Sequence, residues 1–304
     1  MKRTIKLKLN IPVSSILPTL DLYSTAFNYV CQVGFQDRDF NGISLHNKTY
    51  YDCKEYFNLP SQLIISARTK ATESLKPAIG RLNKNLNVSC PTSKYCSIRY
   101  DKNSFSVNFV KNEISLLTIN GRIKTEFQVP KYFKKYLSWR RKSAELFIKN
   151  NKVFLNICFE KETPEIILNN QYVGIDLGIN KPAVLSNNIF YKGGKTKKIC
   201  KKYQTLRSKL QSCGSKSAKR HLKKISKKEN RFKTDMNHCL AKNIINSLES
   251  GTTIVLEQLK YITEKNKSYN KQFNKELHSW AFYQLQEFLK YKAEDKGIII
   301  VYTG

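Results

Sequence analysis

Two short apolar segments that each end in an acidic residue constrain the fold of this chain more than any other feature. Residues 172–176 read YVGID and end at Asp176, and residues 253–257 read TIVLE and end at Glu257. The first segment is apolar on both faces, which is typical of a central strand. An acid buried among apolar side chains without a partner is costly, so Glu257 needs either a cation or an exit to water at the strand end.

The segments around these two strands predict an ordered series of strands and helices. QYVGIDLGINKPAVLSNNIFY (171–191) has the turn spacing of three short strands, and helical periodicity follows it. After TTIVLEQL (252–259), a helix is expected from about His278 to Asp295, and GIIIVY (297–302) forms a last strand. This order is that of an α/β RNase H-like fold, in which carboxylates on neighbouring strand ends bind divalent metal.

The chemistry expected of Asp176 and Glu257 depends on how their strands pair. Parallel neighbours would bring both carboxylates to one end of the sheet, where hard oxygen ligands suit Mg²⁺ or Mn²⁺. Two such ions roughly 3.5–4 Å apart activate water and stabilise the leaving oxygen of a phosphodiester. An alternative for Asp176 is a turn former ahead of Gly178, which its position after a strand also fits.

The segment 192–233 is the most basic part of the chain. It contains 17 Lys or Arg against one acid, Glu229, which amounts to +16 of the formal net charge of +31. Apolar residues recur at helical spacing from Ile199 to Leu248, so we expect two long helices with one apolar stripe and a basic back face. A folded chain of this charge repels itself unless a polyanion neutralises it, and nucleic acid is the expected partner. The side chains expected to bind it are Lys197, Lys198, Lys201, Lys202, Arg207, Lys219, Arg220, Lys223, Lys224, Lys227, Lys228 and Arg231.

The first half of the chain mixes two periodicities. Apolar and charged residues alternate over 3–11, as in a half-buried strand, and helical spacing then indicates an insert at about 14–90. From Ser97 the alternation returns, with Asn-Gly at 120–121 and Asn-Asn at 150–151 as hairpin turns. We expect these strands to form an antiparallel sheet or a small β-barrel that the first strand completes.

A linker between the two halves is expected at KETPEIILNNQ (161–171), which contains a proline and two asparagines. It divides the chain into an α+β part, residues 1–165, with the antiparallel β-barrel and its helical insert, and an α/β part, residues 166–304, with the RNase H-like order. A chain of 304 residues is long enough for two domains with separate cores.

Several classes of protein are excluded by short motifs that the chain lacks. No two of the eight cysteines form a C-x-x-C pair, and the four histidines include no H-x-H or H-E-x-x-H, so no zinc site is expected. The start, MKRTIKLKLNIP, has no apolar core of a signal peptide, and no apolar run approaches the roughly 18 residues of a membrane span. We therefore expect a soluble, cytoplasmic, nucleoid-associated protein with no membrane partner.

Aromatic and basic residues interleave over 131–142 and leave two interpretations open. The aromatic members are Tyr132, Phe133, Tyr136 and Trp139, and lysines and arginines separate them. Aromatic rings can stack on nucleic-acid bases while the cations hold phosphates. A short amphipathic helix that uses the same rings for the core fits the pattern equally well.

Three segments resemble the TnpB proteins, which are transposon-encoded relatives of the type V CRISPR effectors. VGIDLGINKPAVLS and TTIVLEQL are similar to the first and second RuvC motifs of that family, and HSWAFYQLQEFLKYKAEDKGIIIVYTG is similar to its bridging helix. They occur in the family's order and spacing from Tyr172 onward. Residues 1–160 resemble the family's wedge and recognition regions more loosely.

The resemblance implies an RNA-guided DNA endonuclease of a transposable element, of the kind often labelled a transposase. The wedge and the basic helices would hold a guide RNA, base pairing would read the target DNA, and one RuvC-like site would cut both strands. Asp176 matches the first catalytic Asp of the family and Glu257 its catalytic Glu, with Mg²⁺ or Mn²⁺ as the metal.

The sequence departs from the family after residue 302. In the family, the strand that matches GIIIVY is followed by a four-cysteine zinc ribbon and by a third catalytic Asp on a last helix, and this chain shows neither. The departure predicts a truncated protein with weak or no nuclease activity. Two alternatives stay open: a catalytically silent protein that binds guide RNA and DNA, and a strand-transferring transposase with the same RNase H-like fold.

Overall fold

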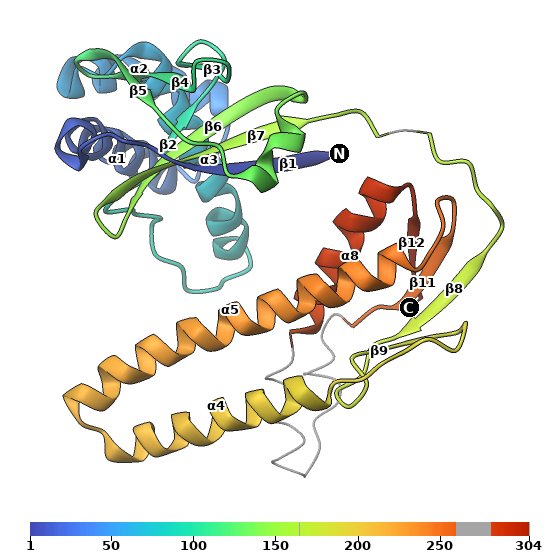
Figure 1. Ribbon diagram of the computed structural model, residues 1–304. Coiled ribbons are helices and arrows are strands. Elements are labelled where there is room, and N and C mark those ends of the chain that lie inside the picture. Colours follow the sequence, from blue (N-terminus) through green and yellow to red (C-terminus); the bar gives the residue numbers. More distant parts are fainter. Residues whose placement is uncertain (164, 260–280, 304) are drawn as a thin grey trace. The chain divides into compact units, whose positions relative to one another are not determined.

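The computed structural model describes residues 1–163, 165–259 and 281–303, which divide into two compact units, Met1–Glu162 and Thr163–Gly304 (Figure 1). The division falls inside the expected linker, although Pro164 itself lies outside the described residues. Each unit has its own hydrophobic core. Within the described ranges, every helix is too short or too polar to span a bilayer.

The main sheet of the first unit is built from strands at both ends of that unit. Its members are β1 (Lys2–Lys8), β2 (Ile98–Tyr100), β6 (Arg140–Lys149) and β7 (Lys152–Glu160). They pair antiparallel in the order β1-β7-β6-β2. Ile5 and Leu7 of β1 are buried while Lys6 between them is exposed, as strand alternation requires. The expected N-terminal strand therefore joins a distant hairpin, with Ile5 opposite Ile157.

The other strands of this unit, β3 (Phe105–Asn108), β4 (Glu113–Thr118) and β5 (Gly121–Glu126), form a second antiparallel sheet. The strands thus divide into two sheets, which an isolated bridge between Leu9 and Phe127 connects, instead of forming the one sheet or small barrel expected. Both expected hairpins are present. Gly121 has φ +89°, and Asn150 and Asn151 have φ of 52° and 55°, the positive values that tight hairpin turns need.

Three helices occupy the insert between β1 and β2. They are α1 (Val13–Gln36), α2 (Gly42–Phe57) and α3 (Ser61–Leu82), so the helical part ends before the expected limit near residue 90. Apolar residues of α1 and α3 recur every three to four positions and share one core with the sheets. Tyr23 of α1 is fully buried, and its hydroxyl lies 2.7 Å from the Ser66 hydroxyl of α3, which links the two helices.

The second unit contains a five-stranded sheet. Its strands are β8 (Tyr172–Asp176), β9 (Ala183–Leu185), β10 (Phe190–Tyr191), β11 (Thr253–Glu257) and β12 (Ile299–Thr303). They lie in the order β10-β9-β8-β11-β12. The first three pair antiparallel, whereas β11 runs parallel to both β8 and β12. The two strands that end in acids are therefore direct parallel neighbours.

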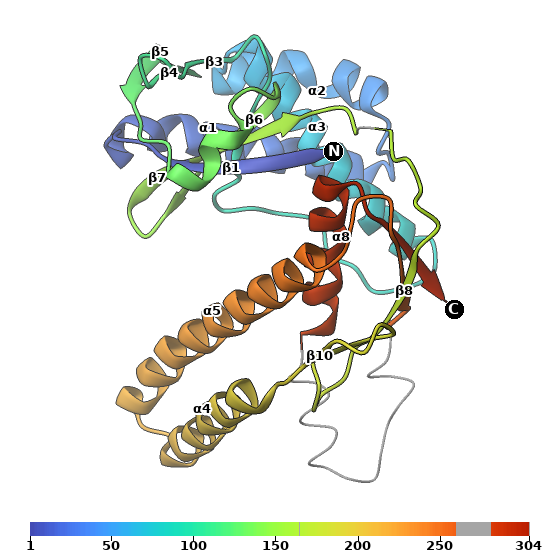
Figure 2. The same ribbon diagram turned by 45° about the vertical axis from the view of Figure 1, so that its right-hand side comes forward.

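Three long helices accompany this sheet: α4 (Gly194–Cys213), α5 (Lys216–Asn246) and α8 (Phe282–Lys296). The structure begins the last of them at Phe282, and residues 278–280 of the expected helix lie outside the described part of the chain. Helices α4 and α5 lie side by side as a hairpin in both views (Figures 1 and 2). The C-terminal part of α5 and the apolar side of α8 pack on the sheet, where Ile244 and Leu285 share a core with Leu256.

Candidate metal centre and nucleic-acid interface

Asp176 and Glu257 end the two central strands of the second unit. Ile175 pairs with Leu256 in the parallel register, and the two acids occupy the next position on each strand. Because Ile175 and Leu256 are buried in the core, strand alternation places the acids on the opposite face of the sheet. Both acids are exposed, so Glu257 leaves the apolar interior at the strand end, as its position requires.

The backbone beside Asp176 is held by β9 and by a tight turn. Gly174 N–H donates to the Ser186 hydroxyl at 3.1 Å, and Ser186 N–H donates to the Gly174 carbonyl at 2.9 Å. Gly178 N–H donates to the Lys181 carbonyl at 3.1 Å and closes the turn after the strand. A turn-forming aspartate accepts hydrogen bonds from the backbone that follows it. Among the described residues, none donates to the Asp176 carboxylate, which leaves that group available to a ligand.

Gln286 fixes the end of β11, and the sequence analysis missed it. Its side chain is buried, and its Nε2 donates to the Glu257 carbonyl at 2.9 Å. It lies on the buried side of α8, next to Leu285 and near Leu289. A buried amide needs a hydrogen-bond partner. An uncharged polar residue inside an apolar helical stripe was therefore the signal that could have identified it.

The donor set at this strand end suits a single hard cation. Mg²⁺ is commonly bound by one or two carboxylates, with water and phosphate oxygens completing its shell. Asp176 and Glu257 meet that requirement by residue type and by register. Within residues 1–163, 165–259 and 281–303, no group of three or more His, Cys, Asp or Glu side chains is arranged to hold a metal ion. The two acids alone are thus a small donor set for two ions.

The basic residues expected to bind nucleic acid lie along the α4–α5 hairpin. All of them are exposed except Arg207, which is half-buried and has its Nη2 3.5 Å from Glu229 Oε1. The apolar stripe is less continuous than expected, because Ile199 is 38 % exposed and Cys239 is also exposed. For Ile199 the physical reason is that α4 packs mainly against α5 and contributes no fully buried side chain among its described residues.

Glu229, the only acid of the basic segment, joins the two helices of the hairpin. Its side chain is 6 % exposed and lies between Lys233 Nζ of the same helix, at 2.9 Å, and Arg207 of α4. A carboxylate at this depth is stable only with such partners. The three side chains therefore fix how α4 lies against α5.

The aromatic cluster near residue 135 serves the core more than the surface. Lys131–Tyr136 forms a short 3₁₀ helix, η1, in which Tyr136 is buried. Phe133 and Trp139 pack partly buried against the core of the first unit, and the Tyr136 and Trp139 rings meet edge to face at 5.2 Å. Tyr132 is the exception, with 60 % of its surface exposed.

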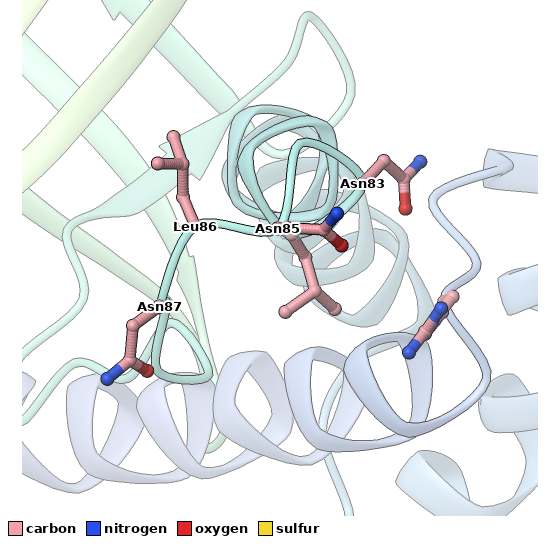
Figure 3. A pocket seen from close by; sticks show the side chains of 6 residues that line it. Asn83, Asn85, Leu86 and Asn87 are labelled. Atoms are coloured by element: carbon pink, nitrogen blue, oxygen red, sulfur yellow. The ribbon is translucent and has the colours of Figure 1, made fainter.

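Described residues also line open cavities at two places. One of about 550 Å³ lies at the end of α3 and is lined by Arg38, Leu82, Asn83, Asn85, Leu86 and Asn87. Figure 3 shows the amide of Asn87 directed away from those of Asn83 and Asn85, so the polar groups do not converge on one point. The other, of about 710 Å³, lies in the second unit between α4, α5 and the loop after β8.

Several known proteins are similar in sequence to parts of this chain. Residues 156–272 match the OrfB_IS605 family, described as a probable transposase. The CRISPR-associated endodeoxyribonuclease Cas12f1 of Syntrophomonas palmitatica is 28 % identical over 169 residues, which are 49 % of this chain and 33 % of that protein. The TnpB-like protein MJ0751 of Methanocaldococcus jannaschii is 31 % identical over 114 residues, 36 % of this chain and 41 % of that protein. The matches therefore span less than half of these relatives.

One solved structure extends the likeness to nearly the whole chain. A cryo-EM structure of a Cas12f1–sgRNA–target DNA complex has a TM-score of 0.68 and 16 % sequence identity, and covers 95 % of this chain and 73 % of that one. At this level of identity the likeness concerns the fold. It confirms a mixed α/β architecture with helices and several sheets.

Proposed function

We propose that this chain, which is similar in sequence to a TnpB-like protein and to Cas12f1, is an RNA-guided DNA endonuclease of a mobile element. We assign the RNase H-like, RuvC-type part to the second unit and the wedge and recognition parts to the first. The order β10-β9-β8-β11-β12, with β11 parallel to β8, supports the first assignment. Two connected sheets with a three-helix insert support the second.

The observation that carries this proposal is the shared register of Asp176 and Glu257 on two parallel central strands. Their carboxylates would hold Mg²⁺ or Mn²⁺, which when bound polarises a phosphodiester and activates water. Gln286 keeps the Glu257 backbone in place, and the β9 pairing does the same for Asp176. Asp176 and Glu257 therefore form a fixed anionic site at one end of the sheet. A phosphate can approach this site only when a cation is bound between them.

The basic hairpin supplies the proposed contact with RNA. All but Arg207 of the basic residues expected to bind nucleic acid are exposed along these two helices, where they can neutralise consecutive phosphates. Contacts to phosphates carry no base specificity, so base pairing of a bound guide with the target would provide it. Guide RNA and target DNA are thus the proposed partners.

Guide-directed cleavage under enzyme excess tests the proposal. The purified chain with a guide RNA and a matching DNA is expected to give slow Mg²⁺-dependent cutting, which Asp176→Asn and Glu257→Gln each abolish without weakening RNA binding. Glu249→Gln, an exposed acid of the same unit, is the matched control and keeps the activity. Cutting that survives in both acid variants would refute the assignment of the site.

A second function is favoured by one observation, the lack of a third ligating side chain near the two acids in the described part of the chain. It is a silent protein that binds guide RNA and DNA. The same assay separates the two functions, because a silent binder retains target DNA without cutting it. A strand-transferring transposase would instead give a product in which a DNA end is joined to the target.

A further inference from the structure

The cavity of about 710 Å³ in the second unit has no role in the functions considered above. It lies between α4 and α5, and it is also lined by Ile179 and Pro182, which follow Asp176 in the chain, and by Tyr191 at the end of β10. Its volume is within the range of small-molecule sites, about 300–1,000 Å³. It is therefore large enough for one nucleotide and too small for a duplex.

One wall of this cavity is strongly cationic. The charged side chains that line it are Lys192, Lys197, Lys201, Arg207, Lys233 and a single acid, Glu229. Lys233 and Arg207 pair with Glu229, and among the described lining residues five cations stand against this one acid, so the lining carries a net positive charge. Lys197 Nζ also donates to Asn180 Oδ1 at 2.8 Å, which ties this wall to the loop after β8. Such a wall suits a phosphate group.

The remaining lining is apolar, with a few neutral polar groups. Met236 and Leu240 of α5 line the cavity together with Ile179. Gln204 and Asn243 bring side-chain amides, which can both donate and accept hydrogen bonds. A flat heterocycle with polar edges fits these surfaces, since its faces require apolar or aromatic contact and its edges require amides.

We propose that this cavity binds one unstacked nucleotide of a single-stranded nucleic acid, with its phosphate against Lys197 and Lys201 and its base against Met236 and Leu240. Because the lining continues from the loop after Asp176, the nucleotide would anchor a strand close to the acid-bearing end of the sheet. The inference deepens the proposed nucleic-acid binding and is independent of any cleavage.

Three cysteines provide a test of occupancy. Cys200 and Cys239 line the cavity, whereas Cys213 lies exposed at the far end of α4. Burial raises the pKa of the Cys200 thiol, and the hydrogen bond to Ser215 lowers that of Cys213, so each alkylation rate is compared with its own value in the unliganded protein. Rates with iodoacetamide are measured by mass spectrometry with adenosine 5′-monophosphate, adenosine or inorganic phosphate as the probe.

The monophosphate is expected to slow alkylation of Cys200 and Cys239 severalfold and to leave Cys213 unchanged. Replacing Lys197 and Lys201 by Gln should abolish the protection. The matched variant Lys209→Gln with Lys216→Gln removes the same charge from two exposed lysines of the hairpin that lie outside the cavity, and it should keep the protection.

Protection by inorganic phosphate equal to that by the monophosphate would overturn the proposal, because it would show an anion site without base contact. Equal losses in the two double variants, or no protection by any probe, would overturn it as well. Protection by the monophosphate in a chain that fails to cut guide-matched DNA would leave this site standing and refute only the nuclease function.

Discussion

Neutralising four lysines of α5 is expected to remove a large part of the salt dependence of RNA binding. The four are exposed, and none forms an ion pair within the described part of the chain; they are Lys223, Lys224, Lys227 and Lys228. Residues four apart lie above one another on a helix, so these side chains form two adjacent rows that a phosphate backbone can follow. Each phosphate contact adds about 0.7–0.9 to the slope of log affinity against log salt, and four add about 3.

A slope of about 3 corresponds to roughly 60-fold in affinity between about 50 and 200 mM salt. Over this range, the RNA affinity of the wild type should therefore fall roughly 60-fold more than the affinity of the variant with Gln at all four positions. Fluorescence anisotropy of a labelled single-stranded RNA, titrated at several KCl concentrations, measures both slopes. The variant with Arg at the same positions keeps the charge and should keep the slope. An unchanged slope in the Gln variant would show that these lysines do not contact RNA.

Four more outcomes follow from individual groups. Mn²⁺ is expected to raise the melting temperature by binding the folded state, and Asp176→Ala should abolish this rise. If the double variant Asp176→Ala, Glu257→Ala kept the full rise in melting temperature, the ion would bind elsewhere. The 304-residue chain with a matching guide and Mg²⁺ should bind RNA but cut DNA slowly. Two acids with no third ligating side chain among the described residues hold an ion loosely, and an ion misplaced by about 1 Å costs of the order of 100-fold in rate. Robust cutting would contradict this. Burial against α8 lowers the pKa of His238, so the neutral ring contributes stability above about pH 6.5 that is lost as the pH falls toward the lowered pKa. In urea titrations, His238→Phe should flatten this decline, whereas a Phe at the exposed His221 should not. Glu229→Gln should lower the free energy of unfolding by about 1–2 kcal/mol yet strengthen RNA binding. A loss of both stability and RNA binding would contradict the role of Glu229 between α4 and α5.

Features that depend on neighbouring residues could be predicted from the sequence. The dipeptides at the two hairpins contain residues that adopt positive φ, and the structure has such values at Gly121, Asn150 and Asn151. The strand ends at Asp176 and Glu257 were also predictable, because the apolar run stops at each acid. Whether these two acids bind metal is a property of the occupied site, and it stays a prediction.

Features that depend on distant contacts could not be derived in the same way. The expected helical insert covers α2, but the limits of this helix could not be predicted, because its buried stripe consists of Leu45, Thr49 and Cys53, which carry little apolar periodicity. The sequence signals for α2 were at its two ends. Asn41 Oδ1 accepts from Ile43 N–H at 2.8 Å as an N-cap, and Asn58 has φ of 46° at the C-terminus. The split into two sheets likewise depends on long-range pairings such as Ile5 with Ile157, which no local pattern encodes.

The parallel pairing of β8 with β11 also determines when the acidic site can exist during synthesis. Ile175 meets Leu256, so the segment that must fold between them includes the entire α4–α5 hairpin. A hairpin of two helices forms from local contacts, and once formed it shortens the loop whose closure the strand pairing requires. On the ribosome, the basic helices would thus be able to hold RNA before residue 257 has emerged. The two carboxylates come together only after that step, so we expect the chain to bind nucleic acid before the proposed metal site forms.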